Sequence, residues 1–114
     1  MKKWIVCLLI MISFSSSAQN IDSAWVRNNY TKKEMYITMR DGVRLFTAVY
    51  MPKSMAEKHP LLMTRTPYSC EPYGENNFDY FWNSYQKEYF KEGYIMVRQD
   101  VRGRWMSEGA FENV

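Results

Sequence analysis

Apolar and polar residues alternate along two successive stretches of the chain, Lys33–Met39 and Val43–Met51. Alternation with a period of two is typical of a half-buried strand. The pair Asp41-Gly42 separates the two stretches, and Asp-Gly between alternating runs is the strongest short-range signal for a β-hairpin. We therefore expect two antiparallel strands. The first has three apolar residues on one face: Met35, Ile37 and Met39.

A third strand and a helix are expected next. Leu61–Thr66 is a short run that ends at Pro67, and the restriction on a residue that precedes proline keeps Thr66 extended. From Asn77 the aromatic residues recur at steps of three and four, which predicts an amphipathic helix of about 12 residues ending at Gly93. We interpret this aromatic stripe as packing against the sheet rather than as a platform for a cofactor or sugar. The stripe comprises Phe78, Phe81, Trp82, Tyr85, Tyr89 and Phe90.

The last strand leads into a charged loop. Tyr94–Val97 is apolar, Arg98–Arg102 is polar, and Gly103 and Gly109 bracket the loop that follows. A strand-helix-strand crossover implies a parallel pair in an α/β sheet, and ligands gather at the carboxyl ends of such strands. The charged residues here have two interpretations, pairing with one another or contact with a ligand. They are Arg98, Asp100 and Arg102.

The first 18 residues have the layout of a secretory signal peptide. Two lysines are followed by the apolar run Trp4–Ile12 and the small residues of Ser13–Ala18, with cleavage expected between Ala18 and Gln19. The apolar run is much shorter than the roughly 18 residues that a membrane-spanning helix needs, although an uncleaved anchor is the alternative. We expect an exported protein, periplasmic or extracellular, without stable membrane insertion after cleavage. Residues 19–29 then form an N-terminal arm and residues 30–114 one domain.

Composition excludes several classes of function. Removing Lys2 and Lys3 from 15 basic residues leaves 13 against 12 acidic ones, a net charge of +1, so nucleic acid is not an expected partner. Cys70 would then be the sole cysteine, which permits no internal disulfide, and no metal site or cofactor site is predicted. We interpret Cys70 as a small, partly buried residue. His59, the only histidine, lies beside Pro60 in a charged connector and is interpreted as solvated.

The sequence contains no complete set of hydrolytic residues. The five glycines never bracket a serine as G-x-S-x-G, and His59 precedes every candidate nucleophile. Motifs for zinc proteases and for phosphate-binding loops are also absent from the sequence.

Three motifs nevertheless resemble one family. MRDGVRLFTAVYMP, PLLMTRTPYS and GYIMVRQDVRGRWMSEGAF, in this order, are similar to the opening of the X-Pro dipeptidyl-peptidase-like, or cocaine esterase-like, serine hydrolases. The resemblance covers about residues 30–114. It implies the N-terminal portion of an α/β-hydrolase fold with an incomplete sheet, in which the fourth strand lies between the second and third. The third strand would then be an edge.

The resemblance also implies one functional residue. In the family, the tyrosine of the R-x-P-Y motif donates its hydroxyl to the oxyanion hole, and this tyrosine corresponds to Tyr68 here. The alternative is a turn tyrosine packed against Pro67. The Asp100–Gly103 run matches the family too and is expected to shape its loop. The family's nucleophile, acid and histidine would lie beyond Val114.

Two functions are consistent with these observations. The first is part of an exported serine hydrolase that cleaves an ester, an amide or an X-Pro peptide through an acyl-enzyme, with a small molecule or short peptide as substrate. The alternative is a non-catalytic exported binding module with an aromatic stacking surface.

Overall fold

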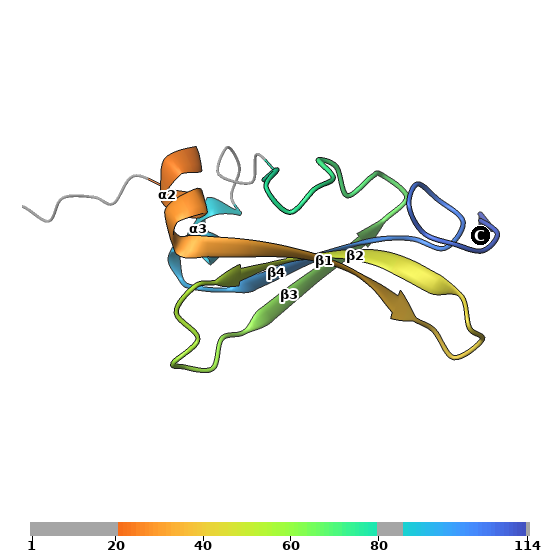
Figure 1. Cartoon of the computed structure of the whole chain (residues 1–114), viewed down its shortest axis with the longest axis horizontal. Helices are drawn as coiled ribbons and strands as arrows, with labels where there is room; N and C mark the ends of the chain where they lie inside the picture. Colours follow the sequence, from red (N-terminus) through yellow and green to blue (C-terminus); the bar gives the residue numbers. More distant parts are fainter. Residues whose placement is uncertain (1–20, 80–85, 114) are drawn as a thin grey trace, which may run out of the picture.

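The computed structural model describes residues 21–79 and 86–113, which form a mixed four-stranded sheet in the order β1-β2-β4-β3. Two helices and the loop after β3 lie over one face of this sheet (Figure 1). The predicted signal peptide, residues 1–18, lies outside the described residues. Among the described residues, no helix combines the length and apolar character needed to cross a membrane.

The predicted hairpin is confirmed. Strands β1 (Tyr30–Thr38) and β2 (Arg44–Pro52) are antiparallel, from the pair Tyr30 and Pro52 to the pair Thr38 and Arg44. Gly42 takes a φ of +87° in the connecting turn, a conformation that favours glycine. The strand β1 begins three residues earlier than the alternating pattern indicated, and these earlier residues carry its buried end.

The other two strands form a parallel pair. Strand β3 (Leu61–Thr66) has the predicted bounds, and it pairs in parallel with β4 (Ile95–Asp100). Strand β4 also pairs antiparallel with β2, so it lies between β2 and β3 as the resemblance implied. Strand β3 is therefore one edge of the described sheet, and β1 is the other.

The hydrophobic core lies on one face, which we call the covered face. In the observed register, the even-numbered residues of β1, β2 and β4 point to this side. Helix α2 (Ser23–Asn29) contributes Val26 to this core, and the Asp22 carboxylate caps the helix by accepting a hydrogen bond from the Trp25 N–H at 2.9 Å. The buried residues of the core cluster are Ile21, Val26, Tyr30, Phe46, Ala48, Tyr50, Cys70, Phe90 and Met96. The stretch expected to be an N-terminal arm, residues 19–29, thus supplies Ile21 and Val26 to the core.

The long helix predicted from Asn77 is not observed. Residues 77–79 are not helical, residues 80–85 lie outside the described residues, and α3 spans only Lys87–Lys91. Phe90 is fully buried, as expected for packing against the sheet, and Gly93 follows the helix end with a φ of +78°. Phe78 reaches the core from a loop, where its ring lies edge-on to the ring of Tyr50, with the two ring centroids 5.5 Å apart. Aromatic spacing alone could not distinguish this loop contact from a further helical turn.

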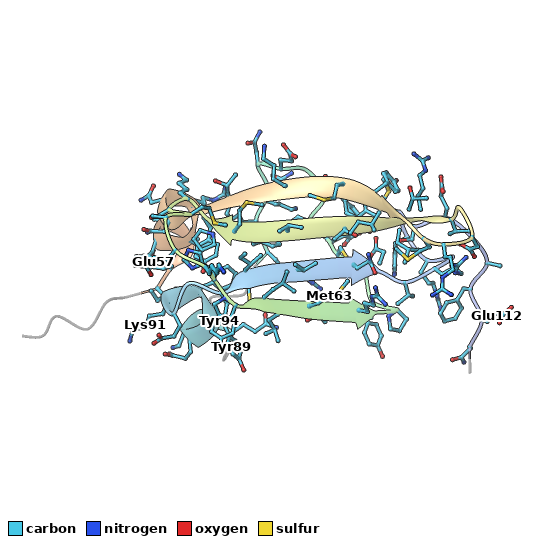
Figure 2. All side chains as sticks on the ribbon, turned by 90° about the horizontal axis from the view of Figure 1, so that it is seen from below. Glu57, Met63, Tyr89, Lys91, Tyr94 and Glu112 are labelled. Atoms are coloured by element: carbon cyan, nitrogen blue, oxygen red, sulfur yellow. The ribbon has the colours of Figure 1, made fainter. Side chains whose placement is uncertain are left out.

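We call the opposite side of the sheet the open face, because no helix of the described residues lies over it (Figure 1). Figure 2 shows this side, with Met63 of β3 among its side chains. The apolar residues of the edge strands are exposed here, although the central strands keep Leu45 and Val97 buried. Met35 and Ile37 are 42% and 38% exposed, so the face expected to be half-buried along β1 is open in this structure.

Candidate functional site at the carboxyl ends of β3 and β4

The candidate site is formed by two loops that leave the sheet side by side. Thr66 and Asp100, the last residues of β3 and β4, are register partners in the parallel pair. The turn that carries Tyr68 and the glycine-bracketed loop after Asp100 therefore start at the same end of the sheet. In α/β sheets, ligands bind at this end, beyond the carboxyl ends of the strands.

The Tyr68 turn is held through its backbone. The Thr66 hydroxyl accepts a hydrogen bond from the Tyr68 N–H at 2.8 Å and donates to the Tyr68 carbonyl at 2.9 Å. The indole N–H of Trp105 donates to the Pro67 carbonyl at 2.8 Å. Tyr68 itself is 78% exposed, so its ring takes little part in the core of the described residues. The turn is fixed while the phenol faces solvent.

A buried carboxylate connects the two loops. Asp100 is fully buried, and its Oδ1 accepts a hydrogen bond from the Cys70 N–H at 2.8 Å. Its Oδ2 accepts from the Tyr73 hydroxyl at 2.9 Å and from the Met106 N–H at 3.3 Å. Burial, with the bond to Asp100, raises the pKa of Tyr73 well above its ordinary value. Asp100 therefore holds both loops, which is the loop-shaping role expected of this stretch.

Ser107 fastens the second loop to β2. Its hydroxyl donates to the Asp100 carbonyl at 2.6 Å and accepts from the Phe46 N–H at 2.9 Å. Gly103 makes the return of this loop possible, because a Cβ there would lie 2.1 Å from the Phe111 nitrogen and the residue has a φ of +71°. The loop is thus a defined structure with specific anchors.

The charged residues do not pair with one another, so that interpretation was wrong. Arg98 forms an ion pair with Asp79 and donates to the Ser69 carbonyl at 3.0 Å. Arg102 pairs with Asp41 of the hairpin turn at 2.7 Å. Each side chain instead ties β4 or its loop to a distant segment, which the local sequence could not indicate.

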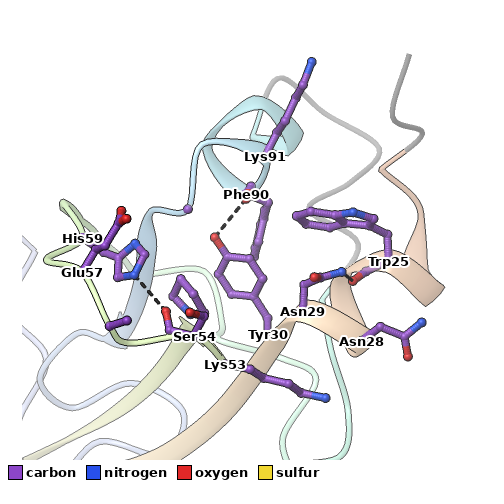
Figure 3. A pocket seen from close by; sticks show the side chains of 13 residues that line it. Trp25, Asn28, Asn29, Tyr30, Lys53, Ser54, Glu57, His59, Phe90 and Lys91 are labelled. Atoms are coloured by element: carbon purple, nitrogen blue, oxygen red, sulfur yellow. Dashed lines mark hydrogen bonds between the residues drawn. The ribbon is translucent and has the colours of Figure 1, made fainter. Parts of the chain in front are cut away.

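Cys70 and His59 lie in different surroundings. Cys70 is 2% exposed, more deeply buried than predicted, and burial together with the bond to Asp100 raises the pKa of its thiol to about 12. His59 lies near the amino end of β3, so the length of that strand separates it from Tyr68. Its Nε2 is 3.0 Å from the Ser54 carbonyl oxygen, in a pocket of about 400 Å³ (Figure 3). No group of three His, Cys, Asp or Glu residues in the described part of the chain could hold a metal.

A second pocket adjoins the Tyr68 turn. Its volume is about 690 Å³, and its lining includes Pro67, Arg102, Asp41 and Phe111. Because the Arg102 guanidinium lies beside it, the pKa of the Asp41 carboxyl is lowered. The site thus combines an exposed phenol, a turn held by hydrogen bonds and a pocket at the carboxyl ends of β3 and β4.

The chain matches known proteins over most of its length. A family model described as X-Pro dipeptidyl-peptidase (S15 family) matches residues 41–114. The cocaine esterase of Rhodococcus sp. (strain MB1 Bresler) is 36% identical over 91 residues, which are 75% of this chain and 14% of that protein. The chain therefore spans about one seventh of this relative's length.

Solved structures with the same local fold include two hydrolases. An α-amino acid ester hydrolase superposes with a TM-score of 0.59 and 32% identity over 90% of this chain and 17% of its own. An aminopeptidase from a marine sediment archaeon, Thaumarchaeota archaeon, superposes with a TM-score of 0.62 and 32% identity over 89% of this chain and 18% of its own.

Proposed function

The chain belongs to the X-Pro dipeptidyl-peptidase (S15) family, and on that premise we propose that it is part of an exported serine hydrolase in which Tyr68 is an oxyanion-hole donor. The substrate is a small ester or amide or a short peptide, cleaved through an acyl-enzyme. The similar proteins include an esterase, an ester hydrolase and an aminopeptidase, which supports this substrate class.

The observation that carries the proposal is the placement of Tyr68. In the α/β-hydrolase fold, the loop after the third strand supplies one donor to the oxyanion hole. Tyr68 occupies that loop, with its backbone held by Thr66, and the residue is 78% exposed. A phenol hydroxyl suits the task because it presents a preset dipole to a charge that develops only in the transition state. A tyrosine whose role was to pack against the core would instead be largely buried.

The nucleophile and its acid and base would come from residues outside this chain. The oxyanion donor alone forms no acyl-enzyme, because covalent catalysis requires an activated nucleophile. Residues 19–114 alone should therefore not react with a serine-directed phosphonate, whereas the full-length hydrolase should be labelled. Stoichiometric labelling of residues 19–114 would contradict this assignment of roles.

Export rests on the layout of residues 1–18. Mass spectrometry of the protein recovered outside the cytoplasm should give Gln19 as its first residue. Retention of Met1 on a membrane-bound product would favour the uncleaved anchor.

Tyr68→Phe in the full-length hydrolase tests the central role. The change removes one hydroxyl and keeps the ring, so substrate binding should change little. Loss of an oxyanion donor should lower kcat by about 10²–10³ while KM changes much less. The measurement is steady-state kinetics on a p-nitrophenyl ester.

Tyr36→Phe is the matched control, because Tyr36 is also an exposed tyrosine but lies on β1. It should leave kcat unchanged. If Tyr68→Phe also leaves kcat within a few-fold, Tyr68 is not in the active site.

A further inference from the structure

The covered face contains a buried lysine that the proposed function does not use. Lys32 of β1 is 2% exposed, and its side chain is entirely buried. Its Nζ lies 2.5 Å from the Pro72 carbonyl oxygen, 2.8 Å from that of Asn77 and 3.1 Å from that of Gly74. All three carbonyls belong to the segment Pro72–Asn77, which we call the crossing loop.

These contacts satisfy the buried charge. An isolated buried ammonium is costly, and it is tolerated where oxygen atoms replace its hydration shell. The Glu34 carboxylate supplies a fourth oxygen at 3.1 Å from Nζ, and the Tyr50 ring centroid lies 5.4 Å away. Burial lowers the pKa of Lys32, and Glu34 opposes this shift. The crossing loop thus surrounds the ammonium with three of its carbonyl oxygens.

Glu34 lies two residues along β1 from Lys32 and binds the same loop as a hydrogen-bond acceptor. Its Oε1 accepts a hydrogen bond from the Gly74 N–H at 2.5 Å. Side chains two apart on a strand point to the same face. Lys32 and Glu34 therefore hold a carbonyl and an N–H of one irregular loop from adjacent positions on the covered face.

A second pair of charged residues continues this attachment toward Tyr68. Arg98 donates to the Ser69 carbonyl, and Asp100 accepts from the Cys70 N–H and the Tyr73 hydroxyl. From Ser69 to Asn77 the backbone is thus held at successive points by side chains of β4 and β1. Tyr68 immediately precedes the first of these points.

We propose that Lys32 is a positioning residue for Tyr68: its buried ammonium anchors the crossing loop on the sheet and thereby fixes the turn that presents the phenol. This inference rests on the proposed function. Lys32 does not touch the reacting atoms. It acts through the backbone, and a displacement of about 1 Å at a catalytic group can reduce the rate about 10²-fold.

The first test is Lys32→Met in the full-length hydrolase, which keeps the aliphatic stem and removes the ammonium. We expect kcat on a p-nitrophenyl ester to fall about 10- to 100-fold, with KM changed less than about three-fold. Lys33→Met is the matched control, because Lys33 is the next residue of β1 and is exposed on the open face. It should leave both parameters unchanged. An unchanged kcat for Lys32→Met would overturn the proposal.

A double-mutant cycle separates positioning from a general loss of structure. If Lys32 acts through the Tyr68 hydroxyl, Lys32→Met should have little further effect on kcat in the Tyr68→Phe background. An equal fall in both backgrounds would show that Lys32 acts elsewhere and would overturn the proposal. A Tyr68→Phe variant with normal kcat would instead contradict the proposed function itself, so the two failures are distinguishable.

Chemical rescue keeps the proposal testable if Lys32→Met does not fold. Lys32→Ala removes three carbons and the ammonium, which propylammonium replaces. Propylammonium should restore soluble, active protein during refolding, whereas n-propanol, which fills the space without a charge, should not. Equal recovery with both compounds, or with neither, would overturn the role of the buried ammonium.

Discussion

On each face of the sheet, some residues have a burial that is unusual for their polarity. On the covered face, Lys32 and Asp100 are almost completely buried, whereas on the open face Leu61 and Met63 are 60% and 39% exposed. The charged residues are buried because an irregular loop crosses them and needs donors and acceptors for its backbone. The apolar residues are exposed because they lie on the edge strand β3 and no described helix lies over them, whereas Leu45 and Val97 of the central strands are buried on the same face. Burial on this sheet therefore depends both on what covers a strand and on its place in the sheet.

The same contrast explains how the candidate site is built. Helix and sheet backbones satisfy their own hydrogen bonds, but the segment from Ser69 to Asn77 has no ladder of its own. Charged side chains of β1 and β4 replace that ladder, which fixes the loop in one place. A loop fixed in this way can hold a catalytic side chain within the narrow geometry that transition-state stabilisation requires.

The largest expected difference between the faces is in thiol reactivity. Burial raises the pKa of Cys70 to about 12, so its thiolate fraction at pH 8 should be on the order of 10³-fold below that of an ordinary thiol. Met63→Cys introduces a thiol on the open face. In the chain of residues 19–114, the aromatic disulfide reagent DTNB should modify the new thiol within minutes and Cys70 only after unfolding. Labelling of the new thiol as slow as that of Cys70 would mean that the open face is covered.

Side-chain truncations in the core and on the open face should also lower the free energy of unfolding by different amounts. Phe90→Ala removes a fully buried ring and should lower the free energy of unfolding by about 3–5 kcal/mol. Met63→Ala should cost less than about 1 kcal/mol because much of that side chain already contacts solvent. Urea denaturation followed by fluorescence measures both changes. A cost for Met63→Ala close to that for Phe90→Ala would contradict the exposure of this face.

The sequence predicted the strands better than the helices. The Asp-Gly pair and the proline after Thr66 are local signals, so the hairpin and the bounds of Leu61–Thr66 could be predicted from neighbouring residues alone. Helix α2 has only seven residues, about two turns, which is too short for a helical period to be recognised. Phe78 has helical spacing relative to the later aromatics, but it packs from a loop.

The site was predictable in position more than in its contacts. The end of a parallel strand and the R-x-P-Y motif indicated Tyr68, whose catalytic role stays a prediction. The partners of Lys32 and Asp100 lie 27 to 45 residues away in most cases, so no local pattern could reveal them. A lysine in an alternating strand is ordinarily solvated, and only the loop above it makes Lys32 a buried residue.

The smallest expected effects compare two carboxylates. Asp100→Asn should lower the free energy of unfolding by about 2 kcal/mol, because an amide cannot accept from the Cys70 N–H and the Tyr73 hydroxyl as well as a carboxylate does. Asp41→Asn, the control, removes an exposed partner of Arg102 and should have no measurable effect, since solvent screens that pair. Urea denaturation at low and high salt measures both variants. Equal costs would contradict the distinction between the buried carboxylate, which holds two loops together, and the exposed one, which does not.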